Sequence, residues 1–144
     1  MNRNKLYDCT VIGGGLAGLT LSIQLAKQGY AVILLEKEQY PFHKVCGEYI
    51  SLESWDFLER NGLPLSNMDL PIIKKLLVTA PDGKALSVGL PLGGFGISRY
   101  EIDHRLKKIA EQAGVTVIEN CRVDDVLFEN DRFSVYTSTG TVTC

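Results

Sequence analysis

A glycine-rich turn constrains this sequence more than any other feature. Gly13-Gly14-Gly15-Leu16-Ala17-Gly18 follows a short apolar run, residues 6–12, and opens a segment with helical patterning, residues 16–28. The apolar run predicts a buried strand, and a second one at 31–35 predicts another that ends at Glu36. Strand, turn, helix and strand in this order form a βαβ unit, whose two strands are parallel neighbours.

The turn has the spacing of a phosphate-binding loop. Gly13 permits the tight turn, Gly15 lets the backbone approach a pyrophosphate, and Gly18 lets the helix pack closely against the strands. No Ser, Thr, Asp or Asn caps the helix, so its first N–H groups and its positive dipole end are left for an anion. We therefore expect the backbone through Leu16 and Ala17 to Gly18 to bind a nucleotide pyrophosphate.

Glu36 bears on the identity of the nucleotide. It lies about 20 residues beyond the turn, where a carboxylate can accept hydrogen bonds from both ribose hydroxyls of an adenosine. Its charge would repel a 2′-phosphate, which argues against NADP. The turn itself does not distinguish NAD from FAD, because both contain ADP. The alternative is a structural glycine turn and a surface glutamate, but strand, turn, helix and acid in one register favour a nucleotide site.

The middle of the chain predicts an insertion between the parallel strands. Residues 40–50 are irregular, and Ser51 can cap a helix that runs to about Asn61. Two strands are expected at 73–79 and 85–90, joined by a tight turn. The glycines from Gly93 to Gly96 predict a loop.

The last third of the chain returns to helix and strand. A capping box at Ser98 and Glu101 begins a helix that Gly114 ends. Residues 115–144 predict three or four short strands joined by tight turns, one of them at Asn130-Asp131. The predicted fold class is α/β: one domain with a Rossmann-type parallel sheet and an antiparallel, strand-rich insertion.

Composition excludes several function classes. Of the 144 residues 45% are hydrophobic and 22% charged, and the net charge of -2 gives no footprint for nucleic acid or an anionic membrane. The four cysteines form no CxxC pair and lie near no histidine at zinc-ligand spacing, so we expect no metal site. With no signal-type or membrane-spanning apolar stretch, reduced thiols predict a cytoplasmic protein.

Three segments together resemble a known group of proteins. Residues 9–36 resemble the FAD fingerprint of the flavoprotein superfamily that includes para-hydroxybenzoate hydroxylase. Residues 41–51, with Cys46-Gly47-Glu48 at their centre, are similar to a stretch of geranylgeranyl reductase-like and halogenase-like flavoproteins. Residues 97–106, which contain Arg99, resemble a helix start in the same proteins. The three motifs are in the family's order and extend the resemblance to essentially the whole chain.

The resemblance implies FAD, bound extended, with the segment around Cys46 near the flavin and Arg99 near the phosphates and ribityl chain. Further cofactor-binding residues expected on this basis are Lys37, Lys44, Cys46, Gly47, Arg99 and, through a backbone contact to adenine, Val123. Cys46 is also the one catalytic candidate. Both residues have a competing interpretation. Cys46 could be a small residue that fits a crowded backbone, and Arg99 could be a solvated residue in the first turn of a helix.

The implied activity is that of a flavin-dependent oxidoreductase with NAD(P)H or another electron donor. Two reaction classes stay open: reduction of an isoprenoid-like double bond, and oxygen-dependent hydroxylation (a monooxygenase) or halogenation of an organic substrate. The expected substrate is accordingly a small isoprenoid or aromatic molecule. The Cys46-Gly47-Glu48 stretch favours the geranylgeranyl reductase-like group.

The family pattern also contains parts that this sequence lacks. Such proteins continue with a Gly-Asp motif and a substrate-covering sheet, so we expect a truncated N-terminal portion, inactive alone. The strands expected at 133–136 and 141–144 would leave a sheet edge open to self-association. A nucleotide-binding fragment without catalysis is the alternative from another functional class.

Overall fold

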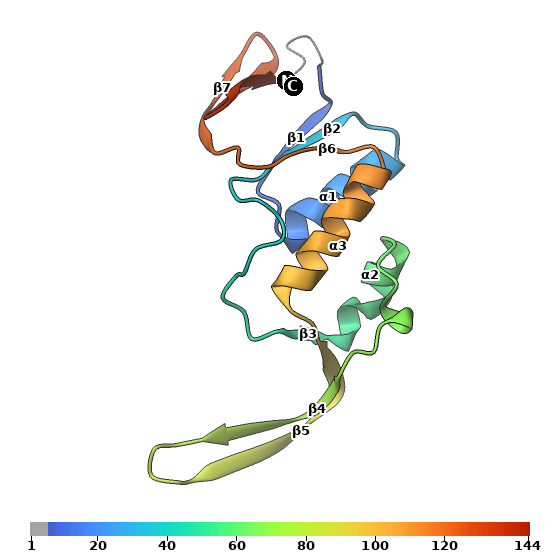
Figure 1. Ribbon diagram of the computed structural model, residues 1–144, viewed down its shortest axis with the longest axis vertical. Coiled ribbons are helices and arrows are strands. Elements are labelled where there is room, and N and C mark those ends of the chain that lie inside the picture. The colour runs from blue at the N-terminus through green and yellow to red at the C-terminus, as the bar shows by residue number, and fades with distance from the viewer. Residues whose placement is uncertain (1–5) are drawn as a thin grey trace. The chain divides into compact units, whose positions relative to one another are not determined.

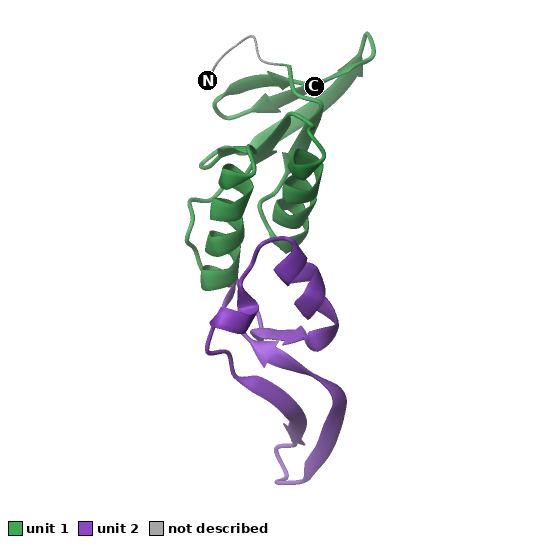
Figure 2. Ribbon diagram, turned by 90° about the vertical axis from the view of Figure 1, so that its right-hand side faces the viewer, with its two compact units in different colours: residues 1–43, 100–144 green, residues 44–99 purple. Residues whose placement is uncertain are grey.

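The computed structural model describes residues 6–144, which divide into two compact units (Figure 2). The first unit contains the residues up to 43 and residues 100–144, and the second contains residues 44–99. Figure 1 shows the helices and strands of both, and each unit is described by itself.

A parallel sheet is the centre of the first unit. Its strand order is β1-β2-β6, with bounds β1 Cys9–Ile12, β2 Val32–Leu35 and β6 Thr116–Ile118. Helix α1, Leu16–Lys27, connects β1 to β2 and packs against both strands (Figure 1). Because β1 and β2 are parallel, the predicted βαβ unit is confirmed.

Strand β2 is buried on both faces of this sheet. All four of its residues are buried, as the apolar run predicts. Ile33 and Leu35 share one face, because side chains alternate along a strand, and they pack in a cluster with Cys121, Val135 and Val142. Burial of this strand fixes the position of Glu36, which follows it directly.

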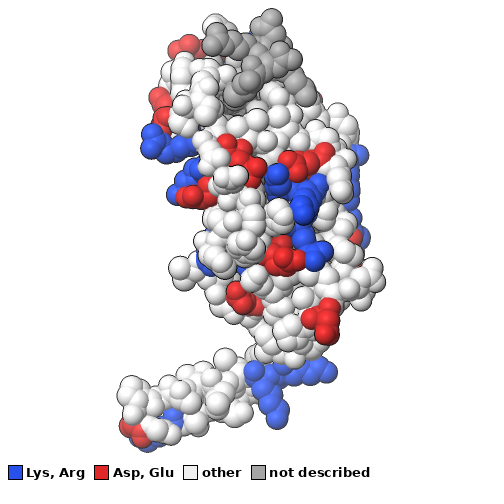
Figure 3. Space-filling view, in the orientation of Figure 1, with Lys and Arg blue, Asp and Glu red and all other residues white. Residues whose placement is uncertain are grey.

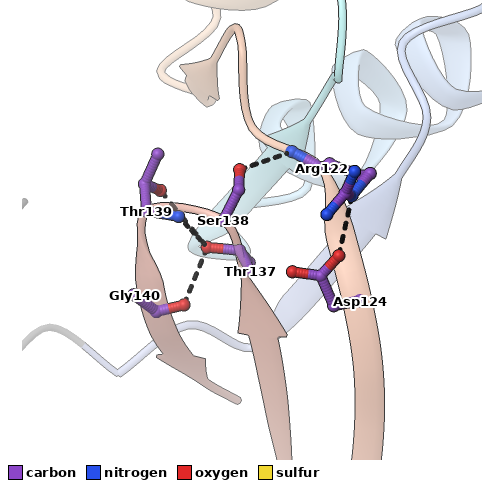
Figure 4. Close-up of polar contacts among 6 residues, drawn as sticks. All are labelled: Arg122, Asp124, Thr137, Ser138, Thr139 and Gly140. Atoms are coloured by element: carbon purple, nitrogen blue, oxygen red, sulfur yellow. Dashed lines mark hydrogen bonds and ion pairs between the residues drawn. The ribbon is translucent and has the colours of Figure 1, made fainter.

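Two of the cluster partners of β2, Val135 and Val142, come from an antiparallel sheet in the same unit. Its strands pair in the order β7-β8-β9, with bounds β7 Val123–Glu129, β8 Arg132–Thr137 and β9 Gly140–Thr143. Asn130 and Asp131 both have positive φ, 54° and 58°, as a two-residue hairpin turn of type I′ requires. At the next turn Thr137 Oγ1 donates to the Gly140 carbonyl at 2.7 Å (Figure 4). The turn at Asn130-Asp131 is therefore confirmed, whereas the turn expected at Thr139-Gly140 lies one residue earlier, at Ser138-Thr139, and Gly140 opens β9.

Helix α3, Arg99–Gln112, leads into β6. Its buried apolar side chains, Ile102, Leu106 and Ala110, lie on one helical face, as the periodicity predicts. The helix ends before Gly114, whose φ of +96° is the left-handed conformation that glycine adopts readily.

The second unit is built on an antiparallel sheet of order β3-β5-β4, with bounds β3 Tyr49–Ser51, β4 Ile72–Thr79 and β5 Ala85–Gly96. A 3-10 turn and helix α2 follow β3, with bounds Leu52–Ser54 and Trp55–Arg60, and a second 3-10 turn spans Leu65–Asn67. Ser51 caps the first turn by accepting a hydrogen bond from the Glu53 N–H. This is the helical segment predicted after Ser51.

Two expectations for the second unit are wrong. Gly93 to Gly96 do not form a loop but continue β5, and part of the segment expected to be irregular forms β3. The reason is close packing, because a Cβ atom at Gly94 would overlap the Tyr49 ring and lie 2.6 Å from the Ile50 carbonyl oxygen. Glycine is thus required inside the strand, where β3 and β5 pair.

Within residues 6–144, no helix has the length and apolar character needed to cross a membrane.

Candidate functional site

The glycine turn leads directly from the end of β1 into α1. Gly13 has φ +96°, and its N–H donates to the Leu35 carbonyl at 2.8 Å, which ties the turn to the end of β2. Gly15 is the N-cap residue of α1, and no side chain caps the helix there. The first N–H groups of a helix have no partner within it, so the α1 end presents donors and a positive dipole end.

Gly18 lies where the helix passes closest to the turn. A Cβ atom at this position would overlap the Gly13 carbonyl oxygen and lie 3.3 Å from Val11 Cγ1. A side chain at position 18 would therefore displace either the helix or the turn. Leu16 and Ala17 occupy the first turn of α1, between these glycines.

Glu36 is buried, with 5% of its surface exposed, and it bonds to the turn. Its Oε2 accepts the Gly14 N–H at 2.8 Å, and its Oε1 accepts the Glu38 N–H at 3.0 Å. The interpretation as a surface glutamate is therefore wrong. A carboxylate has about four acceptor sites, so each oxygen keeps one for a further donor such as a ribose hydroxyl.

Tyr40 is a neighbour of the turn that sequence reasoning missed. It is buried, and its hydroxyl donates to the Gly14 carbonyl oxygen. The available signal was the glycine at position 14, because the G-x-G-x-x-G pattern leaves that position open.

The remaining expected residues of the first unit lie apart from these hydrogen bonds. Lys37 is exposed directly after Glu36. Val123 opens β7 and packs, half-buried, against the cluster that contains Ile33 and Leu35.

The other expected residues belong largely to the second unit. Cys46 is exposed, and its Sγ accepts the Glu48 N–H at 3.4 Å in an irregular segment where Glu48 has φ 55°. A crowded backbone therefore does not explain this cysteine, and a Cβ atom at Gly47 would have nothing within 4 Å. Lys44 is half-buried, and so is Arg99, the first residue of α3.

Across residues 6–144, no three His, Cys, Asp or Glu side chains gather closely enough to hold a metal ion. Acidic and basic side chains are interspersed on the face drawn in Figure 3.

Comparison with known proteins identifies the cofactor. Residues 8–44, from β1 through the glycine turn to just beyond β2, match the family model described as an FAD binding domain. The chain contains an FAD-binding domain. Most of the chain also aligns with the following proteins.

The menaquinone reductase of Mycolicibacterium smegmatis is 26% identical over 132 residues, which cover 88% of this chain and 32% of that protein. The flavin-dependent halogenase armH1 of Armillaria mellea is 30% identical over 137 residues, 84% of this chain and 24% of that protein. A geranylgeranyl bacteriochlorophyll reductase-like protein from Thermoplasma acidophilum has the same fold, with a TM-score of 0.75 and 22% identity over 96% of this chain and 37% of that one. The chain thus spans between about a quarter and just over a third of the length of these proteins.

The residues of the first unit fit an FAD. The turn offers uncapped backbone donors at a helix N-terminus, where a Cβ atom at Gly14 or Gly18 would overlap neighbouring atoms, and the Glu36 carboxylate is fixed beside it. When bound, FAD supplies hydride and electron transfer, and the protein supplies position and electrostatics.

Proposed function

We propose that this chain is the FAD-binding portion of a flavin-dependent oxidoreductase of the geranylgeranyl reductase-like type. The Gly15 to Gly18 backbone would hold the pyrophosphate and Glu36 the adenosine ribose, with Lys37 and the Val123 backbone beside the adenosine. Lys44, Cys46 and Gly47 would contact the flavin, and Arg99 the phosphate-ribityl portion. The proposal covers residues 1–144 as one cofactor domain with an insertion.

The observation that carries the reductase assignment is the irregular segment Lys44–Glu48. It exposes the Cys46 thiol and orders it through the Glu48 N–H. A polarizable thiol beside a flavin can tune electron transfer without forming a covalent bond to substrate, and the chain places no second cysteine of the CxxC kind beside it. The similarity to a menaquinone reductase supports the same assignment.

The second candidate is a flavin-dependent halogenase or monooxygenase. It is favoured by armH1, the relative with the higher identity of the two described above. In both candidates the substrate is a small organic molecule, isoprenoid in the first and aromatic in the second, and NAD(P)H or another donor reduces the flavin.

Anaerobic reduction of the FAD-loaded whole protein, followed by mixing with an oxidant, distinguishes the reductase from the halogenase or monooxygenase. For a reductase we expect a polyprenyl quinone or alkene to reoxidise the flavin and to gain two hydrogens, without any need for oxygen. A product that forms only with oxygen, and carries a new hydroxyl or halogen, would contradict the reductase assignment. The Gly15→Val variant, loaded in parallel, controls for chemistry by free flavin.

A cytoplasmic location and self-association complete the proposal. All four cysteines are free thiols, which fits a reducing compartment.

Self-association would use the outer strands β7 and β9. Strand β8 is paired on both sides, so the open edge expected at residues 133–136 is wrong. A flavin-free preparation that binds nucleotide without redox activity would support the non-catalytic alternative.

A further inference from the structure

Tyr40 lies against the middle of the glycine turn. Its side chain is buried, with 7% exposed, and its hydroxyl donates to the carbonyl oxygen of Gly14. A Cβ atom at Gly14 would overlap this hydroxyl and would lie 3.0 Å from Tyr40 Cζ and 3.2 Å from Glu36 Cβ. Tyr40 therefore makes glycine necessary at a position that the phosphate-binding motif leaves open.

Two hydrogen bonds fix two successive peptide groups of the turn. The Gly14 N–H belongs to the first and donates to Glu36 Oε2 at 2.8 Å. The Gly14 carbonyl belongs to the second and accepts from Tyr40. A trans peptide group is planar, and its N–H points opposite to its C=O. The Gly14 carbonyl and the Gly15 N–H belong to the same peptide group. By holding the carbonyl, Tyr40 therefore directs the Gly15 N–H away from the tyrosine ring, at the uncapped start of α1.

Tyr40 is itself anchored to the rest of the first unit. Its N–H donates to Glu119 Oε1 at 2.7 Å, just beyond the end of β6. Lys107 on α3 lies 3.5 Å from Glu119 Oε2 and 2.9 Å from Glu111 Oε1. The hydrogen bond with Glu111 raises the pKa of Lys107, which further favours its charged ammonium form. Tyr40 thus connects the turn to α3 and β6.

We propose that Tyr40 is a positioning residue of the FAD site, which holds the Gly15 N–H in the direction of the pyrophosphate. The inference rests on FAD binding and is independent of whether the reaction is reduction or halogenation. It applies to any ligand that shares the pyrophosphate, so ADP is affected together with FAD, whereas adenosine is not.

The test is Tyr40→Phe in the whole protein, with calorimetric titration of FAD and ADP and an NMR titration of adenosine. Loss of one buried hydrogen bond at the turn predicts about fivefold to tenfold weaker binding of both FAD and ADP. Adenosine binding should be unchanged, because it does not reach the turn. Tyr30→Phe is the matched control, since Tyr30 is 50% exposed, and it should bind all three ligands as the unmodified protein does.

A double-variant cycle tests the contact directly. With Tyr40 present, Gly14→Ala should lower the affinity for FAD at least tenfold relative to the unmodified protein. In the Tyr40→Phe background, where the overlapping hydroxyl is gone, the same substitution should lower the affinity less. Unchanged FAD and ADP binding in Tyr40→Phe would overturn the proposal, as would an equal loss of adenosine or strictly additive effects. If the unmodified protein does not bind FAD, both the assignment of FAD as cofactor and the role of Tyr40 are overturned. If the reaction proves to be of another class, both assignments stand.

Discussion

Gly18 is the residue at which the helix and the turn approach most closely. A Cβ atom there overlaps the Gly13 carbonyl oxygen, which is backbone and cannot rotate away. Overpacking of this kind forces backbone shifts that typically cost about 1–3 kcal/mol. The cost falls on the turn itself, so cofactor affinity and folding stability are coupled at this residue.

We therefore expect Gly18→Ala to lower the free energy of unfolding by about 1–3 kcal/mol and to weaken FAD. Gly89→Ala is the control, because a Cβ atom at Gly89 would have nothing within 4 Å. Denaturant titration with and without FAD measures both effects. Equal stability of Gly18→Ala and the unmodified protein would show that the turn relaxes freely.

Cys46 is exposed and has only the Glu48 N–H as its described polar partner. No hydrogen bond of the described residues joins Cys46 to a basic side chain, so we expect it to tune the flavin and not to act as a nucleophile. Cys46→Ser in the whole protein should change the rate of flavin reduction without abolishing it, as followed under single-turnover conditions. Complete loss of reduction with flavin still bound would make Cys46 a catalytic residue.

Among the elements, the β7–β8 hairpin has a turn whose sequence is not optimal. Asn130 and Asp131 both have positive φ, a conformation that is disfavoured for residues other than glycine. The usual pair for this turn type is Asn-Gly. The hairpin forms nonetheless, because Val135 of β8 is buried against Ile33 and Leu35.

Replacing Asp131 by glycine should stabilise the protein by about 0.5–1 kcal/mol, since glycine adopts positive φ without steric cost. Asp125→Gly, within the strand β7, should destabilise by a similar amount. Thermal unfolding of both variants measures the difference. A lower melting temperature for Asp131→Gly would contradict the assigned turn geometry.

Sequence reasoning predicts those elements in which local pattern and long-range packing agree. The βαβ unit and the hairpin at Asn130-Asp131 are confirmed, because apolar periodicity and turn residues act over a few positions. Strand β5 through Gly94 was missed, because glycine in a strand is explained only by the Tyr49 ring that crosses it. Tyr40 was missed for the same reason, since its partner Gly14 is distant in sequence.

At the scale of the whole molecule, the groups that we propose to bind FAD, and that hydrogen bonds fix in the first unit, belong to the proposed site for its ADP half. The fixed groups of the first unit are the glycine turn and Glu36, and the relatives are about three times as long. A flavin ring that lacks walls on both faces loses apolar burial and shielding from water.

We therefore expect the 144-residue chain alone to bind FAD weakly, to turn over no substrate and to self-associate. Gel filtration with an absorbance spectrum, followed by a reductant-dependent assay, measures all three. A monomer with stoichiometric FAD and turnover would contradict the interpretation as a cofactor-binding portion.

FAD affinity in the whole protein tests most directly whether the Gly13–Gly18 turn and Glu36 hold the cofactor. Glu36→Ala should weaken FAD by about 1–3 kcal/mol, because charge-assisted hydrogen bonds are lost, and Gly15→Val should block the pyrophosphate. Glu38→Ala is the matched control, since Glu38 is exposed and two residues away, and its affinity should be unchanged. Unchanged affinity in both Glu36→Ala and Gly15→Val would contradict the assigned site.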